Sequence, residues 1–438
     1  MNSVFEKFLR IKGYDIKSSE HSLNKIKNLS RDEFLEWKLK QKFIVARYHF
    51  NNNNFYRKKV GKFFPEKWEE LPILNKKDFQ QDLNIMLSNG YSRKNVYISN
   101  TSGSSGRPFF FAKNKEAHAM DWALIKDRYS WHNLNLNSKQ ARFFGIPLES
   151  FSYIKEKMKD LLMNRKRFSI YNLSDRILWK YFEQFKKIEF DYIYGYTNSL
   201  VLFARFLIKN NIVLKDICPT ISTCITTSEV VTAEDRLLIN KGFGVKVINE
   251  YGASELGIIA FENIKDEWEL SEEILYYETL NESGKNALSG NLILTDLDNL
   301  AMPFIRYNIG DIGIIKESHY PNYKNKQLYK LLGRENDTIY LPSGKISPGF
   351  TLYYVSRSIL ESTGVLKEYL IRQTKINEFI FEIVTDDPLS HEQESIIKEK
   401  VEKYLEPGLN IIFKRMDTIN RPASGKIKHF ISELDKNK

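Results

Sequence analysis

The sequence predicts an α/β fold with two domains: a large N-terminal domain with parallel-rich sheets and a β-rich subdomain, and a small mobile α+β domain. Between residues 95 and 250, strand-like and helix-like stretches alternate, which is typical of a largely parallel sheet. Between about 270 and 330, short strand-like runs are separated by polar turns. A compact α+β unit follows. We therefore expect domains over residues 1–333 and 334–438.

The N-terminal region is predicted to begin with a long helix over residues 31–49. Pro72 then excludes a helix interior at its position, and Asn75 is expected to cap a helix that begins near Lys76. The evidence for the long helix is an apolar stripe at helical spacing, formed by Phe34, Trp37, Leu39, Phe43 and Val45.

The alternating region supplies the predicted parallel sheet. Ligands of such sheets sit beyond the carboxyl ends of the strands. The loops at 101–107, 195–199, 226–229 and 250–255 all follow predicted strands, so we expect them to converge on one site. The predicted strands are 95–99, 109–112, 141–146, 191–196, 218–226 and 245–249, and the predicted helices are 115–132, 176–187, 200–208 and one that opens at Ser228.

The last third of the chain divides near residues 334–337, where a polar break interrupts the pattern. Before this break, short strands are predicted at 276–280, 290–295, 303–307 and 312–315. After it, the pattern predicts helices at 349–360 and 391–404 and strands at 378–384 and 410–414.

Composition excludes several classes of protein. The 438 residues include 66 basic and 55 acidic side chains, a net charge of +11, but the basic residues are spread along the chain, so we do not expect nucleic-acid binding. The two cysteines, Cys218 and Cys224, imply neither a disulfide framework nor a Cys-based zinc site. Because no signal-peptide core or bilayer-spanning apolar run occurs, we expect a cytoplasmic protein without a membrane span.

A loop of hydroxyl side chains and glycines follows the strand-like run at 95–99. Its glycines allow close approach of the backbone to a ligand, and its many donors suit phosphate oxygens. The alternative is a flexible Ser/Gly hairpin turn, and neither a Walker A loop nor a dinucleotide fingerprint is present. The loop consists of Thr101, Ser102, Gly103, Ser104, Ser105, Gly106 and Arg107.

Four further motifs carry chemistry, and each has a plainer alternative. Glu255 is a carboxylate at a strand end, suited to Mg²⁺ beside phosphates, or a charged surface turn. Asp311 follows a glycine and can accept both hydroxyls of a ribose, or marks a hairpin turn. Arg334 is a donor for the same sugar or part of a linker, and Lys426 is a site lysine or a solvated one.

Together and in this order, the motifs resemble those of the adenylate-forming superfamily, which includes acyl- and aryl-CoA synthetases. Thr101–Pro108 is similar to its phosphate loop, Tyr251–Glu255 to its Tyr-Gly-x-[Thr/Ser]-Glu motif, and Tyr307–Asp311 to its Tyr-x-[Thr]-Gly-Asp motif. Gly333–Asp337 resembles the family's hinge and Gly425-Lys426 its catalytic lysine loop.

The stretches at 71–76 and 194–200, with the short length, resemble the phenylacetate-CoA ligase branch, and within it the CapK-like capsule-polysaccharide proteins. The resemblance implies a two-step reaction. The substrate carboxylate attacks the α-phosphate of MgATP to give an acyl-adenylate and pyrophosphate, and an acceptor then takes the acyl group. CoA, an amine and a hydroxyl are the candidate acceptors, and a role in making cell-surface polysaccharide is an expectation by association.

The resemblance also assigns roles to residues. Lys426 would be catalytic, Glu255 would hold Mg²⁺, and Asn336 with Asp337 would form the hinge. Residues Thr101–Arg107 would hold the β- and γ-phosphates, and Asp311 and Arg334 the ribose. The rest of the ATP site would comprise Ser228, Glu229, Asn249, Glu250, Tyr251, Gly252 and Ser254, and the acyl pocket Gly145, Tyr194, Gly195 and Tyr196.

Three features depart from the family pattern. Asn308-Ile309 stands where Arg-Thr is common, and Asn336 occupies the usual aspartate position of the hinge. The glycine-aromatic stretch of phenylacetate ligases is not evident at 143–150. A P-loop NTPase is disfavoured because the Lys-[Ser/Thr] pair is missing. The remaining alternative is a non-catalytic nucleotide-binding scaffold, which would be signalled by loss of Glu255, Asp311 or Lys426, and all three are present.

Overall fold

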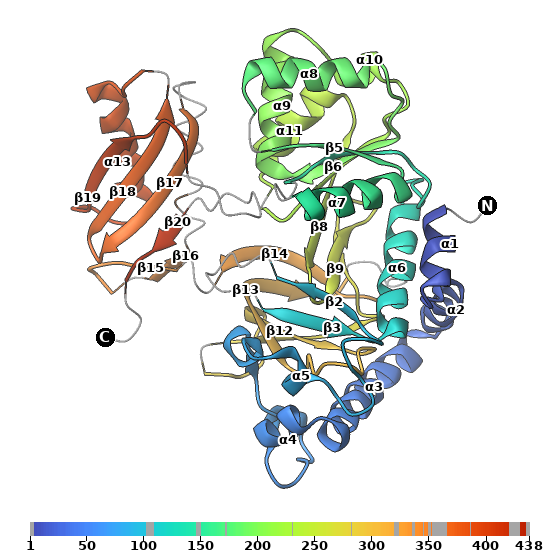
Figure 1. The fold of residues 1–438 in the computed structure, drawn as a ribbon. Coiled ribbons are helices and arrows are strands. Elements are labelled where there is room, and N and C mark those ends of the chain that lie inside the picture. The colour runs from blue at the N-terminus through green and yellow to red at the C-terminus, as the bar shows by residue number, and fades with distance from the viewer. Residues whose placement is uncertain are drawn as a thin grey trace.

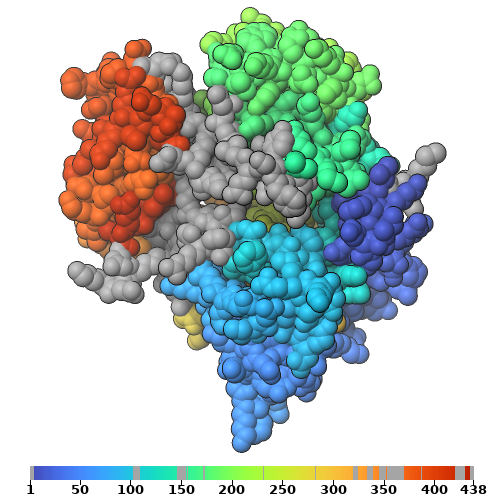
Figure 2. Space-filling model, viewed as in Figure 1, coloured from blue at the N-terminus to red at the C-terminus, as the bar shows by residue number. Residues whose placement is uncertain are grey.

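The computed structural model consists of a large body that carries the N-terminus and a smaller unit near the C-terminus (Figure 1). In the space-filling view, the orange and red C-terminal residues gather beside the green residues of the larger body (Figure 2). The structure describes residues 4–101, 109–145, 150–170, 173–229, 231–281, 283–318, 324–334, 338–344, 346–348, 352, 366–385, 387–419 and 430–434.

Helices form the N-terminal part of the larger body. The predicted long helix is α3 (Arg31–Asn52), and a capping box between Ser30 and Glu33 satisfies backbone groups at its start. Phe34 and Val45 are buried, but Leu39 is 52% exposed, so the predicted apolar stripe is wrong at that position. The other elements before the sheet are α1 (Val4–Ile11), α2 (Ile16–Lys27), α4 (Asn54–Val60), a 3-10 turn at Trp68–Glu70, a 3-10 turn at Lys76–Phe79 and α5 (Leu83–Met86).

Asn75 caps the short helix at Lys76–Phe79, as predicted, through a capping box with Asp78. The predicted runs on either side of the glycine loop are the antiparallel pair β2 (Tyr97–Asn100) and β3 (Phe110–Lys113). The loop therefore joins the two strands of a hairpin that stands apart from the parallel strands in sequence and in pairing.

Five parallel strands form the centre of the main sheet, in the order β5-β4-β6-β7-β8. Their alternate residues face two different cores. Phe143 and Ile193 pack with residues of α8, α9 and α11. Tyr192 and Tyr194 face the opposite side, toward α6 (Lys115–Ser130). The strands are β4 (Gln140–Phe143), β5 (Arg165–Phe168), β6 (Tyr192–Tyr196), β7 (Thr223–Thr227) and β8 (Lys246–Ala253), and the remaining helices are α7 (Ser150–Leu162), α8 (Asp175–Phe185), α9 (Thr197–Lys209), α10 (Leu214–Ile217) and α11 (Ala233–Phe243).

The prediction of a helix that opens at Ser228 is wrong. Ser228 has φ +69, which does not fit a right-handed helix, and α11 begins five residues later. Its cap is Thr232, which forms a capping box with Asp235. The preceding strand is also shorter than predicted, because Cys218 lies just after α10 and before β7.

The β-rich segment continues the same sheet through antiparallel strands. Beyond β8 the order is β9-β10-β14-β13-β12-β11, and β1 (Leu74–Asn75) pairs with β13, giving a sheet of 12 strands. Parallel and antiparallel parts therefore share one hydrogen-bonded surface. The bounds are β9 (Gly257–Glu262), β10 (Trp268–Leu270), β11 (Leu275–Leu280), β12 (Ser289–Asp296), β13 (Tyr307–Lys316) and β14 (Gln327–Arg334).

The prediction of separate strands at 303–307 and 312–315 is also wrong. Residues 303–306 belong to no strand, and the single strand β13 runs unbroken from Tyr307 through the predicted 312–315. Gly310, with φ +82, lies within the strand, where the pairing with β12 shifts register between Asn291 and Ile293. A bulge rather than a hairpin turn therefore presents Asp311.

The C-terminal unit has its own sheet and core. Strands β19-β18-β17-β20 are covered by α13 (His391–Tyr404), and Phe381, Ile397 and Val401 are among the buried residues. The predicted helix at 349–360 lies outside the described residues, apart from Leu352. The strands are β15 (Thr338–Tyr340), β16 (Ile346–Pro348), β17 (Leu366–Lys375), β18 (Glu378–Thr385), β19 (Asn410–Arg415) and β20 (Phe430–Ser432).

None of the helices in the described part of the chain is long and apolar enough to cross a membrane.

Candidate active site

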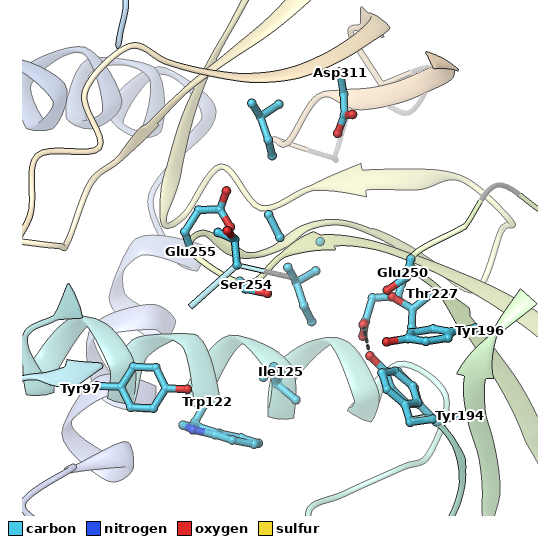
Figure 3. Close-up of a pocket in the computed structure, with 18 of the residues that line it drawn as sticks. Tyr97, Trp122, Ile125, Tyr194, Tyr196, Thr227, Glu250, Ser254, Glu255 and Asp311 are labelled. Atoms are coloured by element: carbon cyan, nitrogen blue, oxygen red, sulfur yellow. Dashed lines mark hydrogen bonds between the residues drawn. The ribbon is translucent and has the colours of Figure 1, made fainter. Parts of the chain in front are cut away.

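A cavity of about 990 Å³ lies between α6 and one face of the parallel strands, at the carboxyl ends of β6, β7 and β8. Figure 3 shows Glu255 and Ser254 near its middle, with Asp311 on β13 across from the helix that carries Trp122. Tyr194, Glu250 and Thr227 gather at one end. This is where an open α/β sheet binds ligands.

Described residues from all four loops that were predicted to converge line this one cavity, although the segments are far apart in sequence. From the loop at 101–107, the described part of the chain includes Thr101. The contributed residues are Thr101, Tyr196, Thr227, Ser228, Glu250, Gly252, Ser254 and Glu255.

Thr101, the first residue of the glycine loop, is held by two hydrogen bonds to Phe109. Its backbone N–H donates to the carbonyl of Phe109 at 3.0 Å, and its hydroxyl accepts the N–H of Phe109 at 3.2 Å. The β2-β3 hairpin therefore holds the root of the loop at the cavity wall. Residues Ser102–Arg107 lie outside the described part of the chain.

Glu255 is buried at the cavity wall and 6% exposed. The hydroxyl of Tyr307, the first residue of β13, donates to its Oε1 at 3.0 Å. Tyr307 is itself packed against Phe79 and Phe304, so its ring is held in place. The carboxylate thus has a defined orientation beside Ser254 (Figure 3).

Asp311 lies on the β13 bulge and is 5% exposed. The hydroxyl of Tyr251 donates to its Oδ2 at 2.5 Å, which joins the ends of two predicted motifs across the sheet. The backbone of Arg334 on β14 pairs with that of Asp311, so the two residues predicted to hold a ribose are neighbours on adjacent strands.

Glu250, at the carboxyl end of β8, lies at the other end of the cavity. The hydroxyl of Tyr194 donates to its Oε1 at 2.6 Å (Figure 3). The hydroxyl of Tyr129 on α6 donates to its Oε2 at 3.3 Å. Burial raises the pKa of Glu250, opposed by the Tyr194 hydrogen bond and the nearby Arg142. Burial and the carboxylate raise the pKa of both tyrosines, so they remain donors.

Some predicted residues support the cavity without lining it. The carboxylate of Glu229 accepts the N–H of Asn198 at 2.8 Å, in the first turn of α9. The backbone of Asn249 is held on both sides, by Glu262 and by the indole of Trp268. The strained φ of Ser228, in contrast, places that residue in the wall.

Two glycines of the predicted acyl pocket lie elsewhere. Gly195 faces the opposite side of the sheet, where an added Cβ would lie 2.7 Å from the Cβ of Phe143. The carbonyl of Gly145 accepts a hydrogen bond from Arg167 at 2.7 Å. Tyr194 and Tyr196, the other two residues of the set, do line the cavity.

One wall of the cavity was missed by the sequence prediction. Gln140 and Arg142 of β4 and Tyr192 of β6 face the cavity, as does Arg165 of β5. On the opposite wall stand Trp122 and other residues of α6. The signal in the sequence is that polar residues, Gln140 and Arg142, alternate along β4 with the buried Ala141. Nothing in the local sequence indicates which face of the strand a ligand would use.

The remaining predicted residues, Asn336, Asp337 and Lys426, lie outside the described part of the chain. Among the residues that the structure does describe, no group of three or more His, Cys, Asp or Glu side chains could hold a metal ion by itself. A single carboxylate such as Glu255 nevertheless fits Mg²⁺, which is usually held by one or two carboxylates together with substrate phosphates.

Residues 349–433 match the model of the CapK C-terminal domain family. A curated relative, Protein CapK of Staphylococcus aureus, is 22% identical over 376 residues, which cover 83% of this chain and 80% of the relative.

Solved structures share the fold. 2-Hydroxyisobutyryl-CoA ligase, in the postadenylation state in complex with R3-HIB-AMP, has a TM-score of 0.70 at 14% identity, covering 94% of this chain and 92% of its own. The anthranilate CoA ligase AuaEII, in complex with anthranoyl-AMP, has a TM-score of 0.52 at 13% identity, covering 78% and 67%. The chain therefore has the fold of adenylate-forming CoA ligases, and its last 85 or so residues have a CapK-type sequence.

Proposed function

We propose that this chain is an adenylate-forming ligase. It activates a carboxylic acid with MgATP to an acyl-adenylate, and then transfers the acyl group to CoA, an amine or a hydroxyl. The observation that carries the proposal is the meeting of Thr101, Glu255 and Asp311, from three distant motifs, at one cavity of a fold shared with ligases that bind acyl-AMP.

In the first step, a carboxylate oxygen of the acid attacks the α-phosphorus of ATP, the bond to the bridging oxygen breaks, and pyrophosphate leaves. Asp311 accepts the ribose hydroxyls, aided by Arg334, and the loop Thr101–Arg107 donates to the β- and γ-phosphates. Glu255 would hold Mg²⁺, which would supply positive charge beside the phosphates. Lys426 bridges the acid and the α-phosphate, where a fixed cation lowers the barrier.

Hydrogen bonds from two tyrosines orient the carboxylates of the site. Tyr251 holds the carboxylate of Asp311 and Tyr307 that of Glu255, so both are oriented before ATP arrives. Orientation in advance reduces the entropy lost on binding. In the second step, we propose that the C-terminal domain, residues 334–438, rotates about Asn336-Asp337 and brings the acceptor to the acyl carbon. The acceptor sulfur, nitrogen or oxygen bonds to that carbon, the bond from the carbon to the phosphate oxygen breaks, and AMP leaves.

The motif pattern and the CapK relative support a place in the phenylacetate-CoA ligase-like branch and a cytoplasmic role in cell-surface polysaccharide synthesis. This part of the proposal rests on sequence likeness alone.

ATP–pyrophosphate exchange across a panel of carboxylic acids tests the adenylation step. Acid-dependent exchange is expected in the wild type. Lys426→Ala should lower it by about 10²–10³-fold, the usual effect of removing one group that stabilises transition-state charge. Lys428→Ala, two positions along the same segment, is the matched control and should exchange at the wild-type rate.

ATP binding, measured by calorimetry, separates the alternatives. If ATP binds but no acid supports exchange, the non-catalytic scaffold is the better reading. If ATP does not bind, the roles of Thr101 and Asp311 are wrong.

A further inference from the structure

The polar wall of the cavity is formed by residues to which the adenylation step assigns no role. Residues Gln140 and Arg142 of β4 are paired in register with Tyr192 and Tyr194 of β6, and Gln140 also with Arg165 of β5. Because these residues occupy alternate positions, their side chains share the face that lines the cavity. The wall runs from Glu250 toward the starts of the strands, away from Asp311.

In the part of the chain that the structure describes, the ion pairs on this side of the sheet leave one arginine without a carboxylate partner. Arg167 is paired with Asp160 at 2.9 Å and Glu156 at 2.7 Å, and Arg165 is paired with the same two carboxylates. Arg142 has no carboxylate within ion-pair distance among the described residues. Arg165 and Arg167 therefore share these two acids, and Arg142 pairs with neither.

Arg142 is nevertheless held firmly. One terminal nitrogen donates to Oε1 of Gln140 at 3.1 Å, and the guanidinium carbon lies 3.9 Å from the ring centre of Phe144 and 4.8 Å from that of Tyr194. Its Nε is buried and has no hydrogen-bond partner in the described part of the chain. Burial, with Arg142 as the next cause, lowers the pKa of Arg165 to about 10.

The nearby acid does not neutralise Arg142 directly. Both oxygens of Glu250 are occupied by tyrosine hydroxyls, from Tyr194 and Tyr129. Tyr192 adds a further donor to the wall, because its oxygen accepts from the amide of Gln140 at 2.6 Å and leaves its own hydrogen to donate. The wall therefore offers donors and a cation to whatever fills it.

We propose that the acid activated here is a dicarboxylic acid, whose second carboxylate is bound by Arg142 and Tyr192 while the first is adenylated. The inference rests on the proposed function and specifies its substrate class. A guanidinium suits a carboxylate because both are planar and form paired hydrogen bonds. An aryl group, in contrast, would leave this cation and these donors without partners.

Matched pairs of acids with equal chain length test the substrate class: succinate with butyrate, glutarate with valerate, and adipate with hexanoate. In pyrophosphate exchange by the wild type, the diacid of at least one pair should exceed its partner by about 10- to 100-fold in kcat/KM, the range for one hydrogen-bonded charge. Arg142→Met should remove that preference, so that kcat/KM for the diacid falls to the value for its monoacid partner. Arg142→Lys should recover part of it.

Lys166→Met is the matched control. Lys166 is the exposed cation on β5 whose register partner is Ala141, so its loss removes equal charge from the other face and should not change the preference. Equal use of both members of every pair, or an equal loss for both in Arg142→Met, would overturn the proposal.

Calorimetry keeps this proposal separate from the proposed function. Each diacid is titrated into the wild type and Arg142→Met with AMP present, which requires no turnover. If a diacid binds to the wild type and not to Arg142→Met, the site is supported even when no acid supports exchange. If no diacid binds to the wild type, the proposal is overturned. ATP should bind both proteins equally, since a loss of ATP affinity would assign Arg142 to a nucleotide phosphate instead.

Discussion

Three tyrosine hydroxyls that donate to carboxylates fix the geometry of the cavity: Tyr194 to Glu250, Tyr251 to Asp311, and Tyr307 to Glu255. The first two pairs each join two strands, and the third joins the start of β13 to the turn between β8 and β9. A single hydroxyl therefore couples the position of a strand to the orientation of an acid on another element.

The Tyr251 contact can be tested by removing one oxygen. Tyr251→Phe keeps the ring but leaves the buried Asp311 without this donor, so ATP affinity should fall by about 3- to 10-fold, the effect of about 0.5–1.5 kcal/mol. Calorimetric titration with ATP measures it. Tyr329→Phe, an exposed tyrosine on β14, is the control and should bind ATP as the wild type does. Unchanged affinity in Tyr251→Phe would show that the contact does not position Asp311.

A second test at this scale concerns Asp298, which lies near the buried pair of Lys113 and Asp121. Burial, then Asp296 and Asp121, raise the pKa of Asp298 from 3.8 to about 8, and its Oδ2 is buried without a hydrogen-bond partner in the described part of the chain. Between pH 4 and 8 the unfolded chain has lost this proton and the folded chain keeps it. The free energy of unfolding therefore falls as pH rises through this window.

Asp298→Asn removes that penalty. We expect the variant to be more stable than the wild type at pH 7 by about 1 kcal/mol or more, with the gain absent at pH 4. Urea denaturation at several pH values measures the difference. Asp266→Asn, at a positive φ that asparagine tolerates, is the control and should show no such trend. A gain that is the same at pH 4 and pH 7 would contradict the assignment.

At the scale of elements, β13 carries Asp311 and is anchored at its start by Arg306. Arg306 forms a buried pair with Glu278 on β11 at 3.0 Å and donates to the carbonyls of Glu69 and Leu71. Glu278 also accepts the indole N–H of Trp68. The pair thus joins β11, β13 and the segment before β1, and fixes where the bulge of β13 lies.

Arg306→Met would leave Glu278 buried and unpaired. The expected loss is about 3–5 kcal/mol in the free energy of unfolding, because an isolated buried charge is strongly disfavoured. Urea denaturation checks this value. Arg31→Met breaks the exposed pair with Glu317, 52% and 59% exposed, and should cost no more than about 1 kcal/mol. A cost for Arg306→Met as small as that of the control would show that the pair does not anchor β13.

Elements with strong local signals could be predicted from the sequence. α3, with its capping box, and the alternating strands β6, β7 and β8 were predicted, because periodicity and caps depend on neighbouring residues. The bulge at Gly310 was read as a turn, since a glycine with positive φ serves both. The start of α11 was misplaced because Ser228 and Thr232 are equally good caps by residue type, and only the backbone at Ser228 decides between them.

The candidate site, like the fold, could be predicted only in part. Motifs indicated Glu255 and Asp311, and the topology rule indicated that their loops meet. The wall of Gln140, Arg142 and Tyr192 could not be predicted, because it depends on the register of β4 against β6 and on the position of α6. Such long-range pairing leaves no mark in the local sequence.

At the scale of the whole molecule, the proposed reaction divides between a large body and a mobile C-terminal unit. If Asn336 is a pivot, then Asn336→Pro fixes its φ and should slow the acyl transfer by 10-fold or more while the pyrophosphate exchange remains within about threefold. Product formation and exchange are measured with the same acid. Asn336→Ala is the control, and a proline variant that slows both steps equally would contradict a hinge at this position.

The two larger cores of the larger body differ in how much of the chain each requires. One is formed by residues between Ala141 and Val247, whereas the other joins Phe5 to Tyr307. On the ribosome the first can fold as soon as its own segment has emerged. The N-terminal helices, which are made earlier, must wait with apolar residues exposed until β13 has been synthesised. The order of folding in the cell is therefore expected to run against the order of synthesis, and the helices at the start of the chain are where a chaperone would bind.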